Sequence, residues 1–166
     1  MLRLLEDGQL LTPLHDRFMR SGPHHHDVPL SDIIDIVLES KPNYLSIEAC
    51  NPGHGHEWDV FQTATLPPGK VIMPGVLDTT TSHIEHPKLV AQRLMNYVRL
   101  VGTDNVVACT DCGFSTAAGA MNVPTEIVYA KLASMVKGAA LADEMAKAEG
   151  VEATVSAAKR QCLPCE

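Results

Sequence analysis

Apolar residues recur with helical spacing in three segments of the chain, and the first of these segments follows Pro29. The recurring positions are Leu30, Ile33, Ile34, Val37 and Leu38. Steps of three and four residues place such positions on one side of a helix, where they can face a core. Ser31 is a suitable N-cap for this helix, and Pro42 is expected to stop it.

Two later segments carry the same pattern. A helix over residues 87–101 is predicted to begin at Pro87, with His86 as its cap, and Gly102 suits its C-terminal turn. Its apolar side consists of Leu89, Leu94, Val98 and Val101. The same periodicity predicts a long helix over residues 125–149.

Short apolar runs between the helices predict strands. These runs cover residues 44–48, 70–73 and 105–110, and a Pro-Gly pair closes the second. A short helix is expected through Trp58 and Phe61, which lie between the first two runs. Strands that alternate with helices indicate parallel βα units with right-handed crossovers. The chain is therefore expected to form an α/β fold.

Polar residues follow each predicted strand. Glu48 ends the first, the segment 74–78 follows the second, and Asp111 and Cys112 follow the third. Parallel strands bring their carboxyl ends to one edge of a sheet, where the chemistry of such folds gathers. The pattern therefore predicts a single site at that edge.

The size of the chain limits the architecture. Its 166 residues are enough for one domain with a core, whereas a closed eight-stranded β/α barrel needs roughly 200 residues or more. The strands that the pattern predicts therefore indicate either a small open α/β sheet or part of a barrel. We assign residues 1–150 to a single β/α domain and residues 151–166 to a C-terminal tail.

Composition narrows the class of protein. A formal net charge of −7 argues against a nucleic-acid partner, which would require a basic face. The chain contains no apolar run that would span a membrane and no basic-then-apolar leader, so a cytoplasmic location is expected. In a reducing compartment the five cysteines are expected to be thiols or metal ligands rather than disulfides.

The pair Cys109-x-x-Cys112 is the most informative of these cysteines. If the strand stays extended, the two side chains point to opposite faces, so Cys109 is predicted to be a small core residue and Cys112 a site residue. Glu48 either reaches solvent or holds a cation, because burying an unpaired carboxylate is costly. His24 and His26 form either a polar turn or a pair of ligands, and zinc accepts N, O and S donors together.

Other polar groups leave alternatives open. The loop of residues 51–58 is either a second site or a structured turn before the short helix. His83 is a candidate for proton transfer in the Thr-rich loop that begins with Asp78. Cys162 and Cys165 form either a redox pair or part of a disordered tail.

Three stretches together resemble the second half of the catalytic barrel of cobalamin-independent methionine synthases. They are "LSDIIDIVLESKPNYLSIEA" (30–49), "KVIMPGVLDTTTSHIEHPKLVAQRL" (70–94) and "NVVACTDCGFST" (105–116). The resemblance covers residues 22–146 and extends to a shorter methionine-synthase-like branch through "GPHHHDVPL" and "NPGHGHEW". It implies a half-barrel of about four βα units. Such a half-barrel has two exposed sheet edges, which a second copy or a complementary half-barrel chain would have to cover.

In that family zinc is held by a His-x-Cys pair, a glutamate and a distal cysteine, and it binds the thiol that receives an alkyl group. The resemblance therefore implies Glu48 and Cys112 as zinc ligands. Since the chain has no His-x-Cys motif, His24 and His26 are predicted as replacements. Thr80 stands where the family has a histidine.

The residues implied for catalysis are His83 and Asp78, and those implied for substrate binding are Asp111 and Asn51. The predicted activity is zinc-dependent transfer of a methyl or other alkyl group, from a donor such as a folate, to a thiol such as homocysteine. The alternative is a catalytically inactive, truncated barrel that acts as a metal-binding or interaction subunit. A third interpretation is a small open α/β protein with a redox tail.

Overall fold

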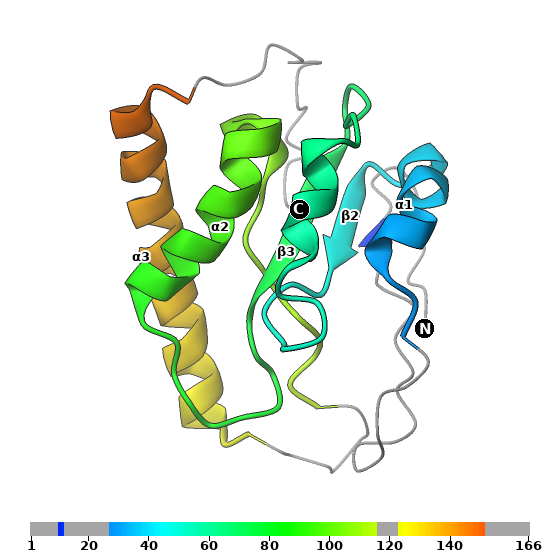
Figure 1. Ribbon diagram of the computed structural model, residues 1–166. Helices are drawn as coiled ribbons and strands as arrows, with labels where there is room; N and C mark the ends of the chain where they lie inside the picture. Colours follow the sequence, from blue (N-terminus) through cyan, green and yellow to red (C-terminus); the bar gives the residue numbers. More distant parts are fainter. Residues whose placement is uncertain (1–9, 12–26, 116–122, 152–166) are drawn as a thin grey trace, which may run out of the picture.

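The structure, a computed structural model, describes residues 10–11, 27–115 and 123–151. These residues form a parallel sheet with the strand order β1-β2-β3-β4 (Figure 1). The strands are β1 (Leu10–Leu11), β2 (Tyr44–Ile47), β3 (Val71–Leu77) and β4 (Cys109–Thr110). The helices are α1 (Leu30–Glu39), α2 (Pro87–Val101) and α3 (Thr125–Glu149). Two short 3-10 helices are η1 (Glu57–Gln62) and η2 (Thr103–Asn105).

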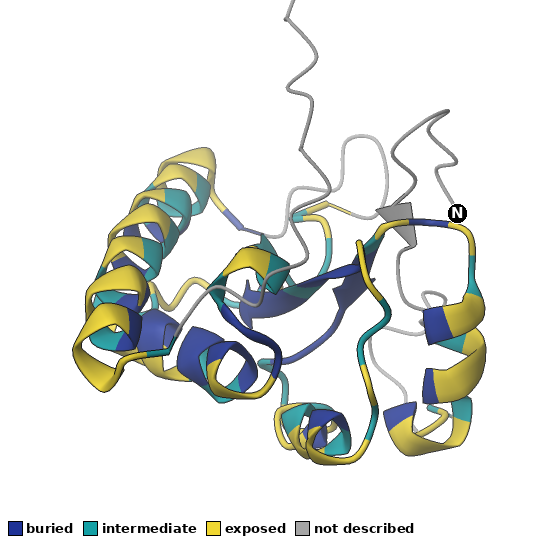
Figure 2. Cartoon of the chain, turned by 90° about the horizontal axis from the view of Figure 1, so that it is seen from above, coloured by how far each residue is buried: buried dark blue, intermediate teal, exposed yellow. Residues whose placement is uncertain are grey.

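The helices lie on one side of the sheet, as the view from above shows (Figure 2). The β2–β3 register pairs Tyr44 with Val71 and Ile47 with Pro74, so both strands point the same way. The carboxyl ends of β2, β3 and β4 therefore meet at one edge. The α/β class is confirmed, and this arrangement is consistent with part of a β/α barrel.

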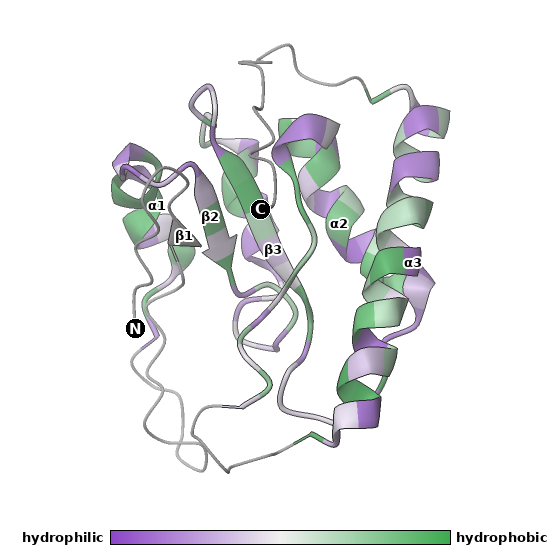
Figure 3. Cartoon of the chain, turned by 180° about the vertical axis from the view of Figure 1, so that it is seen from behind, coloured by the Kyte–Doolittle hydropathy of each residue, from purple (hydrophilic) through white to green (hydrophobic). Residues whose placement is uncertain are grey.

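Two apolar clusters hold the helices against the sheet. The first joins α1, β2 and η1 through residues that include Ile34, Leu45 and Phe61, and Trp58 packs against it. The second joins β3, α2 and α3 through residues that include Val76, Val90 and Ala142. Figure 3 shows apolar positions of α1 and α2 beside polar ones, as the sequence periodicity predicts.

Helix α2 has the predicted ends. Its first residue is Pro87, and His86 Nδ1 accepts a hydrogen bond of 3.1 Å from the Lys88 amide. Gly102 follows the last turn with φ of 85°, which glycine adopts without a steric penalty. One detail of the prediction is wrong: Leu89, placed on the buried side, is 39% exposed because it lies in the first turn, at the edge of the buried face.

The predicted N-cap of α1 is also wrong. The helix begins at Leu30, two residues earlier than Ser31 would allow as a cap, and Ser31 Oγ donates to Asp32 instead. The Leu30 amide donates 2.7 Å to Oε1 of Glu57, a buried side chain from η1. A carboxylate here satisfies a free helix amide and opposes the positive end of the helix dipole. The cap comes from a distant segment, which local sequence pattern does not reveal.

Replacing Glu57 with alanine is expected to lower the free energy of unfolding by about 1–2 kcal/mol, because the amide of Leu30 would lose its buried partner. Urea unfolding followed by circular dichroism measures the change. Glu57→Gln keeps an acceptor oxygen and is expected to cost less. Equal stability of Glu57→Ala and the wild type would contradict the capping role.

The strands differ in length from the prediction. Strand β3 continues through Pro74 and Gly75 to Leu77, although the Pro-Gly pair was expected to end it. Strand β4 comprises only Cys109–Thr110, and earlier pairing is limited to an isolated bridge between Ile72 and Val106. The register between β3 and β4 then shifts between Gly75 and Leu77, opposite Cys109 and Thr110.

Several predictions lie outside the described residues. They concern His24 and His26, the tail of residues 152–166, and the cysteines Cys162 and Cys165 within it. Strand β1 was not predicted, because the sequence before Pro23 has no regular apolar pattern. No helix in the described part of the chain is long and apolar enough to cross a membrane.

Candidate functional site

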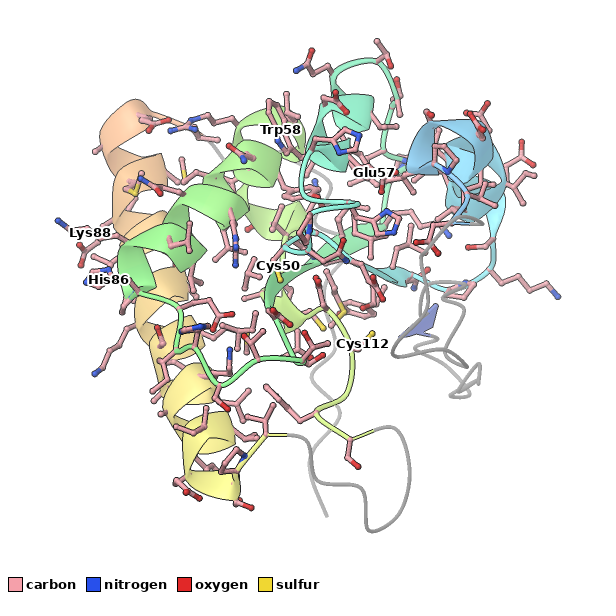
Figure 4. The ribbon with its side chains drawn as sticks, turned by 60° about the horizontal axis from the view of Figure 1, so that its bottom comes forward. Cys50, Glu57, Trp58, His86, Lys88 and Cys112 are labelled. Carbon is pink, nitrogen blue, oxygen red and sulfur yellow. The ribbon has the colours of Figure 1, made fainter. Side chains whose placement is uncertain are left out.

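The carboxyl ends of β2 and β4 bring Glu48 and Cys112 into contact. The Cys112 thiol donates to Oε1 of Glu48 at 3.0 Å, although the residues lie 64 positions apart in the sequence. Glu48 is buried, and Cys112 is half-buried at the start of the loop after β4 (Figure 4). The sequence placed these residues at neighbouring strand ends, and the structure brings them together.

Asp111 links the same strand ends through the backbone. Its Oδ1 accepts hydrogen bonds from the amides of Ala49 at 2.8 Å and Cys50 at 3.1 Å. Burial raises the pKa of Asp111 above its ordinary value; hydrogen bonds from Ala49 and Cys50 oppose the rise, and the charge of Glu48 adds to it. The carboxyl of Asp111 therefore holds the end of β4 against the end of β2.

The predicted opposite orientation of the two cysteines is wrong. Cys109 is half-buried, and its Sγ lies 3.7 Å from the hydroxyl of Ser46. Cys112 contacts Glu48, which lies two residues after Ser46 and so on the same side of an extended strand. The chain bends after Thr110, so the alternation on which the prediction relied does not continue. Cys109 therefore faces the same side as the Glu48–Cys112 contact rather than the apolar core.

Cys50 is a neighbour of this site that the sequence did not single out. It is half-buried beside Asp111 (Figure 4). Burial raises the pKa of the Cys50 thiol far above its ordinary value, and the charge of Asp111 and a hydrogen bond to it raise it further. Cys50 is thus a protonated thiol at neutral pH. The sequence feature that could have identified Cys50 as a neighbour of the site is its position two residues after Glu48, just beyond a strand end.

The loop after β3 carries Asp78 and His83. Burial alone would raise the pKa of Asp78, but hydrogen bonds from Thr80 and Thr81 lower it below its ordinary value. His83 is exposed, and its backbone carbonyl accepts a hydrogen bond from the ammonium of Lys131. The structure therefore presents Asp78 as a carboxylate and leaves the His83 ring at the surface.

The loop of residues 51–58 is a structured turn. Nδ1 of His54 lies 2.8 Å from Glu57 Oε2, and its Nε2 lies 3.9 Å from Asp27. His86 lies at the start of α2, at the left edge of the view in Figure 4, whereas Cys112 lies near its middle. These histidines therefore serve local structure.

Glu48 and Cys112 supply one oxygen and one sulfur donor in contact. Both are donor types that zinc accepts. Within the described residues, no group of three or more His, Cys, Asp or Glu side chains is placed to hold a metal ion. His24 and His26, the predicted nitrogen donors, lie outside those residues.

A parallel βα arrangement with polar groups at the carboxyl edge of the sheet is typical of β/α-barrel enzymes. The chain is similar to the solved structure of a B12-independent methionine synthase from Shewanella sp. W3-18-1 in complex with selenomethionine, with a TM-score of 0.57 and 23% sequence identity. The similarity covers 70% of this chain and 31% of that one, so this chain spans about a third of the solved protein. At this identity the comparison supports the fold alone. No family model and no curated protein matches the chain.

Proposed function

We propose that this chain forms part of a zinc-dependent β/α-barrel transferase that moves a methyl or other alkyl group to a thiol such as homocysteine. The observation that carries the proposal is the contact of 3.0 Å between Cys112 and Glu48 at the carboxyl edge of the sheet. A second support is the fold similarity to a B12-independent methionine synthase.

The donor chemistry of this pair fits zinc. Glu48 and Cys112 would hold the ion together with further donors, for which we propose His24 and His26. When bound, zinc would supply the acidity that converts a substrate thiol to a nucleophilic thiolate at neutral pH. The chain itself contributes the buried setting of Glu48, in which Asn51 and Cys112 each hold one oxygen of the carboxyl group.

The other residues with proposed roles lie in the segments that follow β3 and β4. Asp78, whose carboxyl is ionised at neutral pH, would hold a polar group of the substrate or donor. His83 would exchange protons with the reacting groups, because its exposed ring is accessible. Asp111 would contribute to the substrate pocket beside Glu48.

Completion of the barrel by a second copy or a complementary chain is part of the proposal. Tyr129 and Val136 lie seven residues apart on α3, and each is 69% exposed. Residues at this spacing share one side of a helix, so they place two large apolar side chains on one exposed face of α3. Sedimentation of the purified chain tests this, and a monomer at all accessible concentrations would contradict self-association.

Replacing Cys112 with serine is expected to abolish stoichiometric zinc binding, because a hydroxyl is a much poorer zinc donor than a thiolate. Elemental analysis of the purified protein after dialysis measures the metal content. Cys50→Ser is the matched control, since Cys50 is also a half-buried thiol beside the site. If Cys112→Ser retains the zinc content of the wild type, the assignment of the metal site fails.

The alternative is a metal-binding or interaction subunit without turnover. It is favoured by the observation that the described residues bring two candidate donors, Glu48 and Cys112, into contact, whereas zinc sites are usually tetrahedral. A methyl-transfer assay on the zinc-loaded chain, with homocysteine and a folate donor, separates the two functions. Turnover that is lost in Cys112→Ser would exclude the inactive subunit.

A further inference from the structure

The side chain of Asn51 lies between the two buried carboxylates at the carboxyl edge of the sheet. Its Nδ2 donates to Oε2 of Glu48 at 2.8 Å and to Oδ2 of Asp111 at 3.3 Å. One amide group therefore joins the two acidic side chains that meet at the ends of β2 and β4. No other side-chain amide among the hydrogen bonds of the described residues contacts both carboxylates.

The orientation of this amide is determined by its own turn. Oδ1 of Asn51 accepts hydrogen bonds from the amides of Gly53 at 2.9 Å and His54 at 3.0 Å. The reverse orientation would place the NH₂ group against two N–H donors and the oxygen against two carboxylates. The turn therefore directs both Nδ2 hydrogens towards Glu48 and Asp111.

This arrangement divides the two oxygens of Glu48 between different partners. Oε2 is held by Asn51, and Oε1 is held towards the thiol of Cys112. Without the amide, Glu48 and Asp111 would lose the donor group that Nδ2 supplies to both, and the repulsion between two buried like charges would act against their approach. Glu48 would then turn away from Asp111, and its contact with Cys112 would be lost.

We propose that Asn51 is a positioning residue, which orients Glu48 for metal binding beside Cys112 rather than contacting the substrate. This inference rests on the proposed function, because it concerns the metal site of Glu48 and Cys112. Polar groups that orient metal ligands typically change metal affinity by about 10–100-fold when they are removed. The sequence analysis predicted substrate binding for Asn51, because a sequence does not show which side chains its amide contacts.

The test is the zinc affinity of Asn51→Ala and Asn51→Ser, measured by competition with a chromophoric chelator. A serine hydroxyl at position 51 can still accept from the turn amides of Gly53 and His54, but it is too short to reach the carboxylates. Both variants are expected to bind zinc about 10–100-fold more weakly than the wild type. Asn105→Ser is the matched control, since the amide of Asn105 donates to Val101 away from this site.

The urea midpoint of each variant shows whether weaker zinc binding comes from the orientation of Glu48 or from a less stable fold. For Asn51→Ser, a midpoint close to that of Asn105→Ser together with weaker zinc binding is the expected result. Unchanged zinc affinity in Asn51→Ser, when Cys112→Ser binds weakly, would overturn this inference and leave the proposed function intact. Unchanged affinity in Cys112→Ser would overturn both.

Discussion

Replacing Lys131 with methionine is expected to lower the free energy of unfolding by about 3–5 kcal/mol, which is the usual cost of removing one partner from a buried ion pair. Lys131 lies on α3 and is 0% exposed. Its ammonium lies 2.9 Å from Oε2 and 3.1 Å from Oε1 of Glu85, and it also donates to the carbonyl of His83. Methionine fills similar space but leaves the buried carboxylate without its counter-charge.

The change is also expected to disturb the loop after β3. Oε1 of Glu85 accepts a hydrogen bond of 2.8 Å from the amide of Asp78, and the backbone carbonyl of Glu85 accepts from Ser134. Helix α3 therefore holds the segment that carries Asp78 and His83. We expect Lys131→Met to reduce any activity that depends on this loop as well as stability.

Urea unfolding measures the stability of Lys131→Met, with Lys137→Met as the matched control on the exposed side of the same helix. The control is expected to change stability by less than about 0.5 kcal/mol. The double variant Lys131→Met with Glu85→Gln removes both charges and is expected to recover part of the loss. A single variant as stable as the Lys137 control would show that the ion pair does not stabilise the fold.

Replacing Gly75 with alanine is expected to lower the free energy of unfolding by about 3 kcal/mol, because it overpacks the contact between β3 and the end of β4. A Cβ atom at Gly75 would lie 2.6 Å from Cα and 2.7 Å from N of Asp111. These are backbone atoms, so a change of rotamer cannot relieve the clash. Asp111 would have to move away from β3. The hydrogen bond from its backbone amide to the Leu77 carbonyl would weaken, and so would the hydrogen bond from the Ala49 amide to its carboxyl group.

The matched control is Gly113→Ala, in the loop that follows Asp111. A Cβ atom at Gly113 would meet its nearest neighbour, the carbonyl oxygen of Ser115, at 3.5 Å, which is an ordinary contact. Thermal or urea unfolding of the two variants should therefore differ clearly, and the zinc affinity of Gly75→Ala should fall because Cys112 follows Asp111 directly. Equal stability of the two variants would show that the approach of Asp111 to β3 is not tight.

The site could be predicted from sequence to the extent that it depends on parallel strand ends. Glu48 ends one predicted strand and Cys112 follows another, and the parallel arrangement requires these ends to meet at one edge. The orientation of Cys109 could not be predicted, because the chain bends after Thr110 and the alternation of an extended strand ends there. The side-chain amide of Asn51 can contact Glu48 and Asp111 together only because the segment after β4 lies beside the segment after β2.

The sequence by itself determined the order of helices and strands from α1 onwards, the extent of α2 and α3, and the strand ends that carry Glu48 and Cys112. Those features depend on apolar periodicity and on local turn residues, which a single sequence displays. The tertiary structure alone decided the capping of α1 by Glu57 and the burial of Lys131 against Glu85. These contacts join residues 27 and 46 positions apart, and no local pattern records the geometry that brings such residues together.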